Sequence, residues 1–137
     1  MNIILDSNIF FSAIIKDAIT REIITKSKQS FLMPLIVFEE FKKYKEEIIK
    51  KSGLDYISFK QVVIKVMKYI KLVKDKQFEN YFKEALTIMK DIDEKDSIFV
   101  ACALAFNCPI WSDDNHFKRQ NRIKSFTTKE ILNLLKI

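Results

Sequence analysis

The sequence predicts an α/β protein, a three-layer α/β/α sandwich with a mainly parallel central sheet. Short apolar runs of strand length alternate along the chain with longer segments whose apolar residues recur at helical spacing. One Gly and two Pro favour long helices with few elaborate loops, and they argue against a β-sandwich or a propeller. The 137 residues are 48% hydrophobic, which suffices for a sizeable core. We therefore expect a single domain over residues 1–137.

The first half of the chain predicts two strands and four helices. Each strand is a short apolar run, and Pro34 ends the second one. Asp6, Ser7 and Asn8 are good N-cap residues after the first strand, and Gly53 is a typical helix stop. The predicted strands are residues 2–5 and 31–33, and the predicted helices are 9–15, one that begins at Asp17 or Thr20, 35–51, and 59–69 with Ser58 as its cap.

The second half is organised around the segment Asp91–Asn107, whose acidic start is followed by an almost wholly apolar run. A helix that is apolar on every side must be buried on every side, so residues 98–106 predict a central helix. Its acidic end places carboxylates at the border of the core, which is costly unless a cation meets them. The other predicted elements are strands at 69–73, 109–112 and 125–126, a helix with apolar residues from Phe78 to Met89, and a final helix capped by Thr127 or Thr128.

Carboxylates from four segments are expected at one edge of the sheet. Right-handed crossovers between parallel strands place the strand C-termini along one edge, where such sheets bind ligands. The acidic residues concerned are Asp6 after the first strand, Asp113 and Asp114 after a later strand, Asp93 and Asp96 in the first turn of the buried helix, and Glu39 and Glu40 in the helix that follows Pro34.

The chemistry of such a cluster indicates a metal. Several carboxylates in one pocket repel each other, so they take up protons or bind a cation. Ligands that are all oxygen suit Mg²⁺ or Mn²⁺. Such ions activate water and stabilise the leaving oxygen when a phosphodiester is displaced. The net charge of +6 favours an anionic partner such as nucleic acid, so the sequence predicts a nuclease.

Each acidic residue also has a purely structural interpretation. Asp6 could serve only as a helix cap, and Asp93, taken alone, is better interpreted as one. One of Glu39 and Glu40 is expected on a solvated helix face, and helical phase does not separate the two. His116 is a single histidine without a partner that the sequence identifies, so a surface or supporting role is favoured for it.

Several classes of protein are excluded by composition. Cys102 and Cys108 do not make a disulfide framework, and we expect both to be small buried residues. With a single His and two separated Cys, a structural zinc site is not expected. The short N-terminal apolar run carries Asp6 and lacks a basic start, so we do not expect it to be a signal peptide. No apolar stretch has the length of a membrane span, and we expect a cytoplasmic protein without membrane contact.

Four segments resemble motifs of the PIN-domain family of metal-dependent ribonucleases. They occur in the family's order, and the resemblance runs from near residue 3 to near residue 128. It is closest to the compact prokaryotic members, including the VapC-like toxins of toxin–antitoxin pairs. The resemblance implies the same three-layer α/β sandwich. The segments are ILDSN at 4–8, PLIVFEEF at 34–41, DEKDSIFVACAL at 93–104 and PIWSDDNHF at 109–117.

The resemblance also implies a metal site. Glu40 matches the family pattern better than Glu39, and Asp113 falls at a variable place. His116 stands where many VapC-like members have another acid, which argues against a site of five acids. The implied reaction is hydrolysis of RNA phosphodiester bonds with Mg²⁺ or Mn²⁺, and the implied partners are RNA, an antitoxin protein and a second copy in a homodimer. The residues implied are Asp6, Glu40, Asp96 and Asp114 as metal-binding catalytic acids, with Asn8, Asp93 and Ser112 in support.

Other functions fit the sequence less well. A phosphatase that uses Asp6 as its nucleophile usually has a second Asp two residues later, where this chain has Asn8. A receiver-like signalling domain requires an acidic pair right after the first strand and an acceptor Asp in mid-chain, and neither is evident. The main alternative is a catalytically weak PIN fold that only binds RNA or a protein, although all four acids are present.

Overall fold

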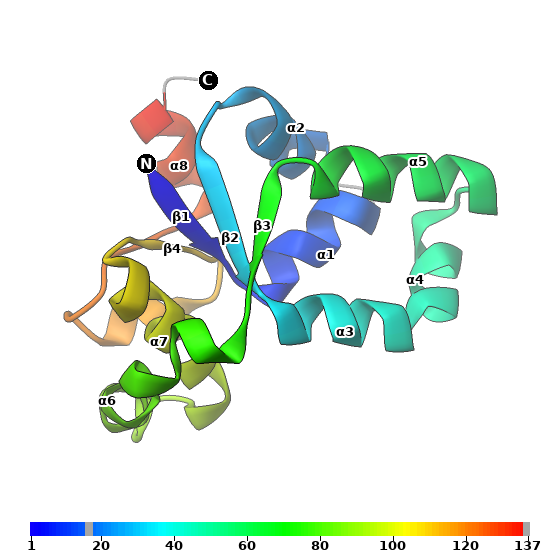
Figure 1. Ribbon diagram of the computed structural model, residues 1–137. Coiled ribbons are helices and arrows are strands. Elements are labelled where there is room, and N and C mark those ends of the chain that lie inside the picture. The colour runs from blue at the N-terminus through cyan, green and yellow to red at the C-terminus, as the bar shows by residue number, and fades with distance from the viewer. Residues whose placement is uncertain (16–17, 136–137) are drawn as a thin grey trace.

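The computed structural model describes residues 1–15 and 18–135, so Asp17, one of the two expected starts of the second helix, lies outside the described residues. Five strands form one sheet in the order β3-β2-β1-β4-β5 (Figure 1). Every pair in it is parallel, which confirms the predicted α/β sheet. The strands are β1 (Asn2–Leu5), β2 (Ser30–Pro34), β3 (Ile70–Val73), β4 (Ile110–Trp111) and β5 (Ser125–Phe126).

Helices cover the sheet on both sides, as predicted for a three-layer fold. Helix α7 packs against β1, β2 and β4, while α1, α3, α4 and α5 lie on the other side of the strands (Figure 1). The α-helices are α1 (Ser7–Ile15), α2 (Ala18–Lys26), α3 (Leu35–Lys43), α4 (Lys45–Ser52), α5 (Tyr56–Met67), α6 (Phe82–Met89), α7 (Ser97–Phe106) and α8 (Thr128–Leu135). Short 3₁₀ turns are η1 (Asp75–Gln77), η2 (Glu79–Tyr81), η3 (Glu94–Asp96) and η4 (Asn115–Arg119).

The register between β1 and β4 determines which residues meet at the sheet edge where the acids were expected. Leu5 is paired with Trp111 in the parallel ladder. The next residue of each strand therefore leaves the sheet at the same edge, and these two residues are Asp6 and Ser112. The backbone N–H of Asp6 still donates to the carbonyl oxygen of Trp111, at 3.3 Å. Two segments more than a hundred residues apart thus begin the site side by side.

The helix predicted over residues 35–51 is two helices. Tyr44, with φ −105° and ψ 20°, separates α3 from α4 without a Pro or Gly. A straight helix rises about 1.5 Å per residue, so an unbroken one would extend away from the core. The bend instead turns α4 back toward α1 and α5 and buries Ile48 (Figure 1). Gly53, at φ 70°, ends α4 as predicted.

Two other helix starts differ from expectation. Asp55, not Ser58, caps α5, because its carboxylate accepts from the backbone N–H of Ser58 at 2.8 Å. The segment predicted as one helix from Phe78 to Met89 begins with 3₁₀ turns, and only Phe82–Met89 is α-helical. The final helix follows Thr127, whose hydroxyl accepts from the Glu130 N–H at 3.2 Å.

Helix α7 is the buried central helix that its composition predicts. Val100, Ala101, Cys102 and Ala103 are all fully buried, and the helix ends at Asn107 in the left-handed conformation with φ 49°. Cys102 is a free buried thiol, as expected, and burial raises its pKa to about 12. No helix within residues 1–15 and 18–135 has the length and apolar character needed to cross a membrane.

Candidate metal centre

Asp6 is the buried acid at the centre of the sheet edge. It is only 5% exposed. One carboxylate oxygen accepts from the Ile9 N–H at 2.9 Å and so caps α1, while the other accepts from the hydroxyl of Ser112. Burial raises the pKa of Asp6 to about 6, against the lowering effect of both hydrogen bonds; Asp96 and Asp114 raise it further by charge repulsion. Asp6 therefore caps α1, and its surroundings also disfavour its charged form.

Ser112 joins Asp6 to the next carboxylate of the cluster. Its side chain is buried, and its Oγ accepts from the backbone N–H of Asp114 at 2.9 Å. A hydroxyl has one proton to donate, and here that proton goes to Asp6. One hydroxyl thus holds the carboxylate of Asp6 and the backbone of Asp114 in place.

The neighbours Asp113 and Asp114 have different surroundings. Both oxygens of Asp113 accept from Thr128, one from its N–H and one from its hydroxyl, at 2.7 Å each. This carboxylate therefore fastens the start of α8. The Oδ1 of Asp114 accepts from the His116 N–H at 2.9 Å and lies 3.3 Å from the His116 Nδ1. Of the two, only Asp114 faces the other acids.

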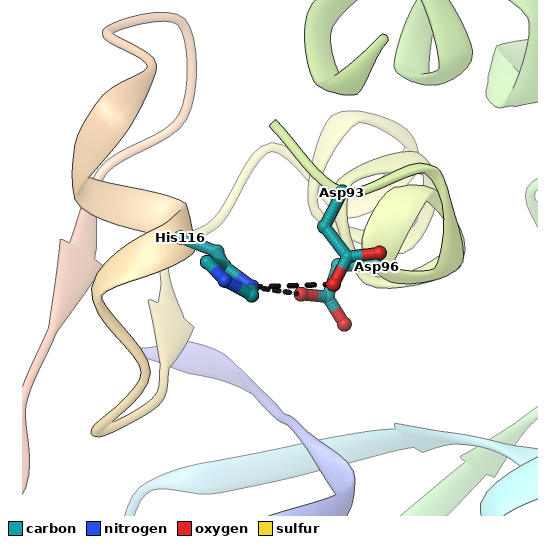
Figure 2. A group of neighbouring side chains, drawn as sticks. All are labelled: Asp93, Asp96 and His116. Atoms are coloured by element: carbon teal, nitrogen blue, oxygen red, sulfur yellow. Dashed lines mark hydrogen bonds and ion pairs between the residues drawn. The ribbon is translucent and has the colours of Figure 1, made fainter. Parts of the chain in front are cut away.

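Asp93 and Asp96 reach the same place from the loop before α7. Their Oδ2 atoms lie 3.3 Å and 3.2 Å from the Nδ1 of His116 (Figure 2). Asp93 also caps η3, because its Oδ1 accepts from the Lys95 N–H at 3.0 Å, in line with the capping expectation. Asp96 stands at the N-cap of α7 but makes no capping bond with its side chain. Burial, more than any other cause, raises the pKa of Asp96, and the hydrogen bond with His116 opposes that shift.

His116 has a more central position than its sequence indicated. Its side chain is 37% exposed, and its Nδ1 is surrounded by oxygens from Asp93, Asp96 and Asp114. No partner for His116 could be identified from the sequence, because two of the three acids precede it by 20 residues or more. The sequence feature that could have indicated the position of His116 is the apolar Phe117 directly after it. Phe117 is buried in the structure, and it anchors the turn that follows Asp114, so that His116 is kept at the site.

Glu40 lies at the rim and not in the cluster. It is exposed on α3, and its carboxylate makes no hydrogen bond or ion pair with any residue the structure describes. It nevertheless lines a groove of about 330 Å³ together with Ser7 and Asp96, whereas Glu39 does not. Asn8 is exposed at the start of α1, and within the described ranges its side chain has no hydrogen-bond partner in the site.

The cluster has more negative charge than its neighbours neutralise. Within residues 1–15 and 18–135, no Lys or Arg side chain forms an ion pair with Asp6, Asp93, Asp96 or Asp114. In that part of the chain, His116 is the basic side chain that lies within ion-pair distance of Asp93, Asp96 and Asp114. Atoms of Asp93, Asp96 and His116 lie within 4.8 Å of one another, a spacing at which they could hold a metal ion. Uncompensated oxygens with one imidazole therefore fit a divalent cation.

This geometry defines a general class of protein: an α/β fold with clustered carboxylates at the carboxyl edge of a parallel sheet. Comparison of sequences identifies the family within that class. The family profile described as PIN domain matches residues 4–136, almost the whole chain. The chain therefore belongs to the PIN domain family, as its motifs indicated.

A solved structure has the same fold. A chain in the crystal structure of VapBC2 from Rickettsia felis, bound to a DNA fragment from their promoter, superposes with a TM-score of 0.70. The two share 18% sequence identity, and the match covers 93% of this chain and 98% of the other. No curated protein matches the sequence significantly.

Proposed function

We propose that the protein is an endoribonuclease that hydrolyses RNA phosphodiester bonds with Mg²⁺ or Mn²⁺, bound through Asp6, Glu40, Asp96 and Asp114. One observation carries the proposal. Carboxylates that follow β1, precede α7 and follow β4 lie close together around the buried Asp6. Burial and the neighbouring acids raise the pKa of Asp6, and no Lys or Arg among the described residues pairs with the cluster. Membership of the PIN domain family and the basic chain support the nuclease reaction in particular.

In the proposed mechanism the protein holds oxygens in fixed directions. When bound, a divalent ion supplies an activated water and neutralises charge that develops on the phosphate. Ser112 keeps one oxygen of Asp6 in place and directs Asp114 through its backbone N–H. Asp96 stands at the N-cap of the buried α7, which sets its position. Glu40 lines the adjoining groove, where it would complete the ligand set from the rim.

RNA cleavage with Mg²⁺ or Mn²⁺ tests this function. We expect Asp6→Asn and Asp96→Asn each to lose at least about a hundredfold in rate, since each removes a charged ligand. Asp113→Asn is the matched control, because Asp113 adjoins Asp114 but binds only Thr128. It should retain activity. Unchanged cleavage in both ligand variants would disprove the assignment.

The main alternative is a PIN fold that only binds RNA or protein. The observation that favours it is the carboxylate of Glu40, which is exposed and pairs with none of the residues that the structure describes. Titration calorimetry separates the two functions: absence of Mn²⁺ binding at millimolar metal would favour the binding module. Binding that Asp96→Asn removes would favour the nuclease.

We further propose an antitoxin partner and a homodimer, which would make the protein the toxin of a toxin–antitoxin pair. The similarity to a VapBC2 structure supports the partner. Exposed apolar side chains on α5 support an interface: Tyr56 is 51%, Ile57 69% and Ile64 56% exposed. Light scattering of the purified chain tests the dimer. Co-purification with the product of an adjacent small gene tests the antitoxin.

A further inference from the structure

We propose that His116 is itself a metal ligand, and that it makes the position shared with Asp93 and Asp96 selective for Mn²⁺ and related first-row ions over Mg²⁺. The inference rests on the proposed function, because it concerns the same metal centre. It adds a nitrogen ligand to a site that the sequence alone predicts as purely oxygen.

The geometry around the imidazole supports this role. Its Nδ1 lies 3.2 Å from an oxygen of Asp96 and 3.3 Å from oxygens of Asp93 and Asp114. One ring nitrogen carries at most one proton, which cannot satisfy three carboxylates. Ligand atoms about 2.1 Å from one octahedral ion are about 3 Å apart along an edge, close to these separations. The separations between the ring nitrogen and the three oxygens are therefore close to those between ligands of a common cation, and atoms of Asp93, Asp96 and His116 all lie within 4.8 Å of one another.

The position of the ring is built into the fold. Phe117 is 1% exposed and meets Phe99 of α7 edge to face, with ring centroids 6.2 Å apart. The backbone N–H of His116 donates to Asp114 at 2.9 Å. The contact between the two rings packs η4 against α7, and Asp96 stands at the N-cap of that helix. Figure 2 shows the imidazole directed at the carboxylates of Asp93 and Asp96.

The choice of metal follows from the donor atoms. Mg²⁺ prefers oxygen ligands and gives up water reluctantly, whereas imidazole is a good ligand for first-row transition metals. One imidazole among carboxylates therefore favours Mn²⁺ relative to Mg²⁺. The competing role is that of a resident counter-ion, in which a charged ring neutralises the three acids and competes with any metal. The two roles predict opposite effects when the ring is removed.

Metal binding to the full chain without a histidine tag distinguishes them. Mn²⁺ and Mg²⁺ affinities are measured by calorimetry at pH 8 for the wild type, His116→Gln and the neighbouring control Asn115→Ala. We expect His116→Gln to bind Mn²⁺ at least about tenfold more weakly, with a smaller change for Mg²⁺ and none in the control. Tighter binding of both ions by His116→Gln would overturn the proposal in favour of the counter-ion.

Electron spin-echo spectroscopy of bound Mn²⁺ gives an independent readout. The chain has a single histidine, so a nitrogen-14 coupling from imidazole can come only from His116. We expect that coupling in the wild type and its loss in His116→Gln. Mn²⁺ that binds in an Asp96-dependent manner without the coupling would overturn this inference and leave the nuclease proposal intact. No Mn²⁺ binding to the wild type would overturn both.

Discussion

Replacing Asp6 by Asn should stabilise the metal-free protein, although it should abolish the proposed activity. Burial raises the pKa of this carboxyl from 3.8 to about 6, so the folded state disfavours the charged form. Asn is neutral at every pH, and its oxygen can still accept from the Ile9 N–H that caps α1. The substitution therefore removes a buried charge and keeps the cap.

The magnitude follows from proton linkage. A shift from 3.8 to about 6 corresponds to a cost of about 3 kcal/mol at pH 8, where Asp6 is ionised both folded and unfolded. Between these two pKa values the folded state binds more protons than the unfolded state, so the cost of Asp6 decreases as the pH falls. At pH 5 about half of it remains. The advantage of Asp6→Asn should decrease to the same extent.

Urea unfolding in the presence of a chelator measures this advantage at pH 8 and pH 5. Groups distant from Asp6 titrate alike in both proteins, so the difference between wild type and Asp6→Asn reports Asp6 together with its charge coupling to Asp96 and Asp114. Asp113→Asn is the control, because it weakens two hydrogen bonds to Thr128 and should cost about 1 kcal/mol. The reasoning is refuted if Asp6→Asn is no more stable than the wild type at pH 8, or if its advantage is independent of pH.

Two further predictions concern the same region. Ser112→Ala removes a hydrogen bond that lowers the pKa of Asp6, so Mn²⁺ binding should begin to weaken at a higher pH than in the wild type; identical pH profiles in calorimetry would contradict this. Ser97 is fully buried, and its hydroxyl has no partner within the described residues, so Ser97→Ala should raise the free energy of unfolding by about 1 kcal/mol; a loss of stability in urea titrations would count against that account.

The sheet and its acidic edge were predictable because they depend on local patterns. A parallel strand that is buried on both faces is a continuous apolar run, and the residue after it must leave at the carboxyl edge. That is why Asp6 and the pair Asp113 and Asp114 could be assigned to one edge from two short segments, and the pairing of Leu5 with Trp111 shows that the ends of these two strands lie side by side. Helix α7 was predictable for a similar reason, since its apolar residues occupy every face.

The predicted helix boundaries were wrong where contacts between residues distant in sequence determine the structure. Apolar periodicity continues through Tyr44, so nothing local marks the bend that returns Ile48 to the core. The cap of α5 is a different case, because Asp55 was as good a cap as Ser58 and stands three residues earlier. Ser58 was predicted because the apolar positions were counted from Phe59, whereas the helix begins at Tyr56, directly after Asp55.

The choice between Asp113 and Asp114 shows what the sequence lacks at the site. Adjacent residues leaving a strand point in different directions, and composition does not say which direction meets the metal centre. The structure decides through Thr128, 15 residues later, which engages both oxygens of Asp113 and leaves Asp114 to the cluster. The role of His116 also depends on residues distant in sequence, but its partners Asp93 and Asp96 come from an earlier segment of the chain. Acidic residues reveal a site by their number, whereas a single histidine reveals its role only when the fold places it among them.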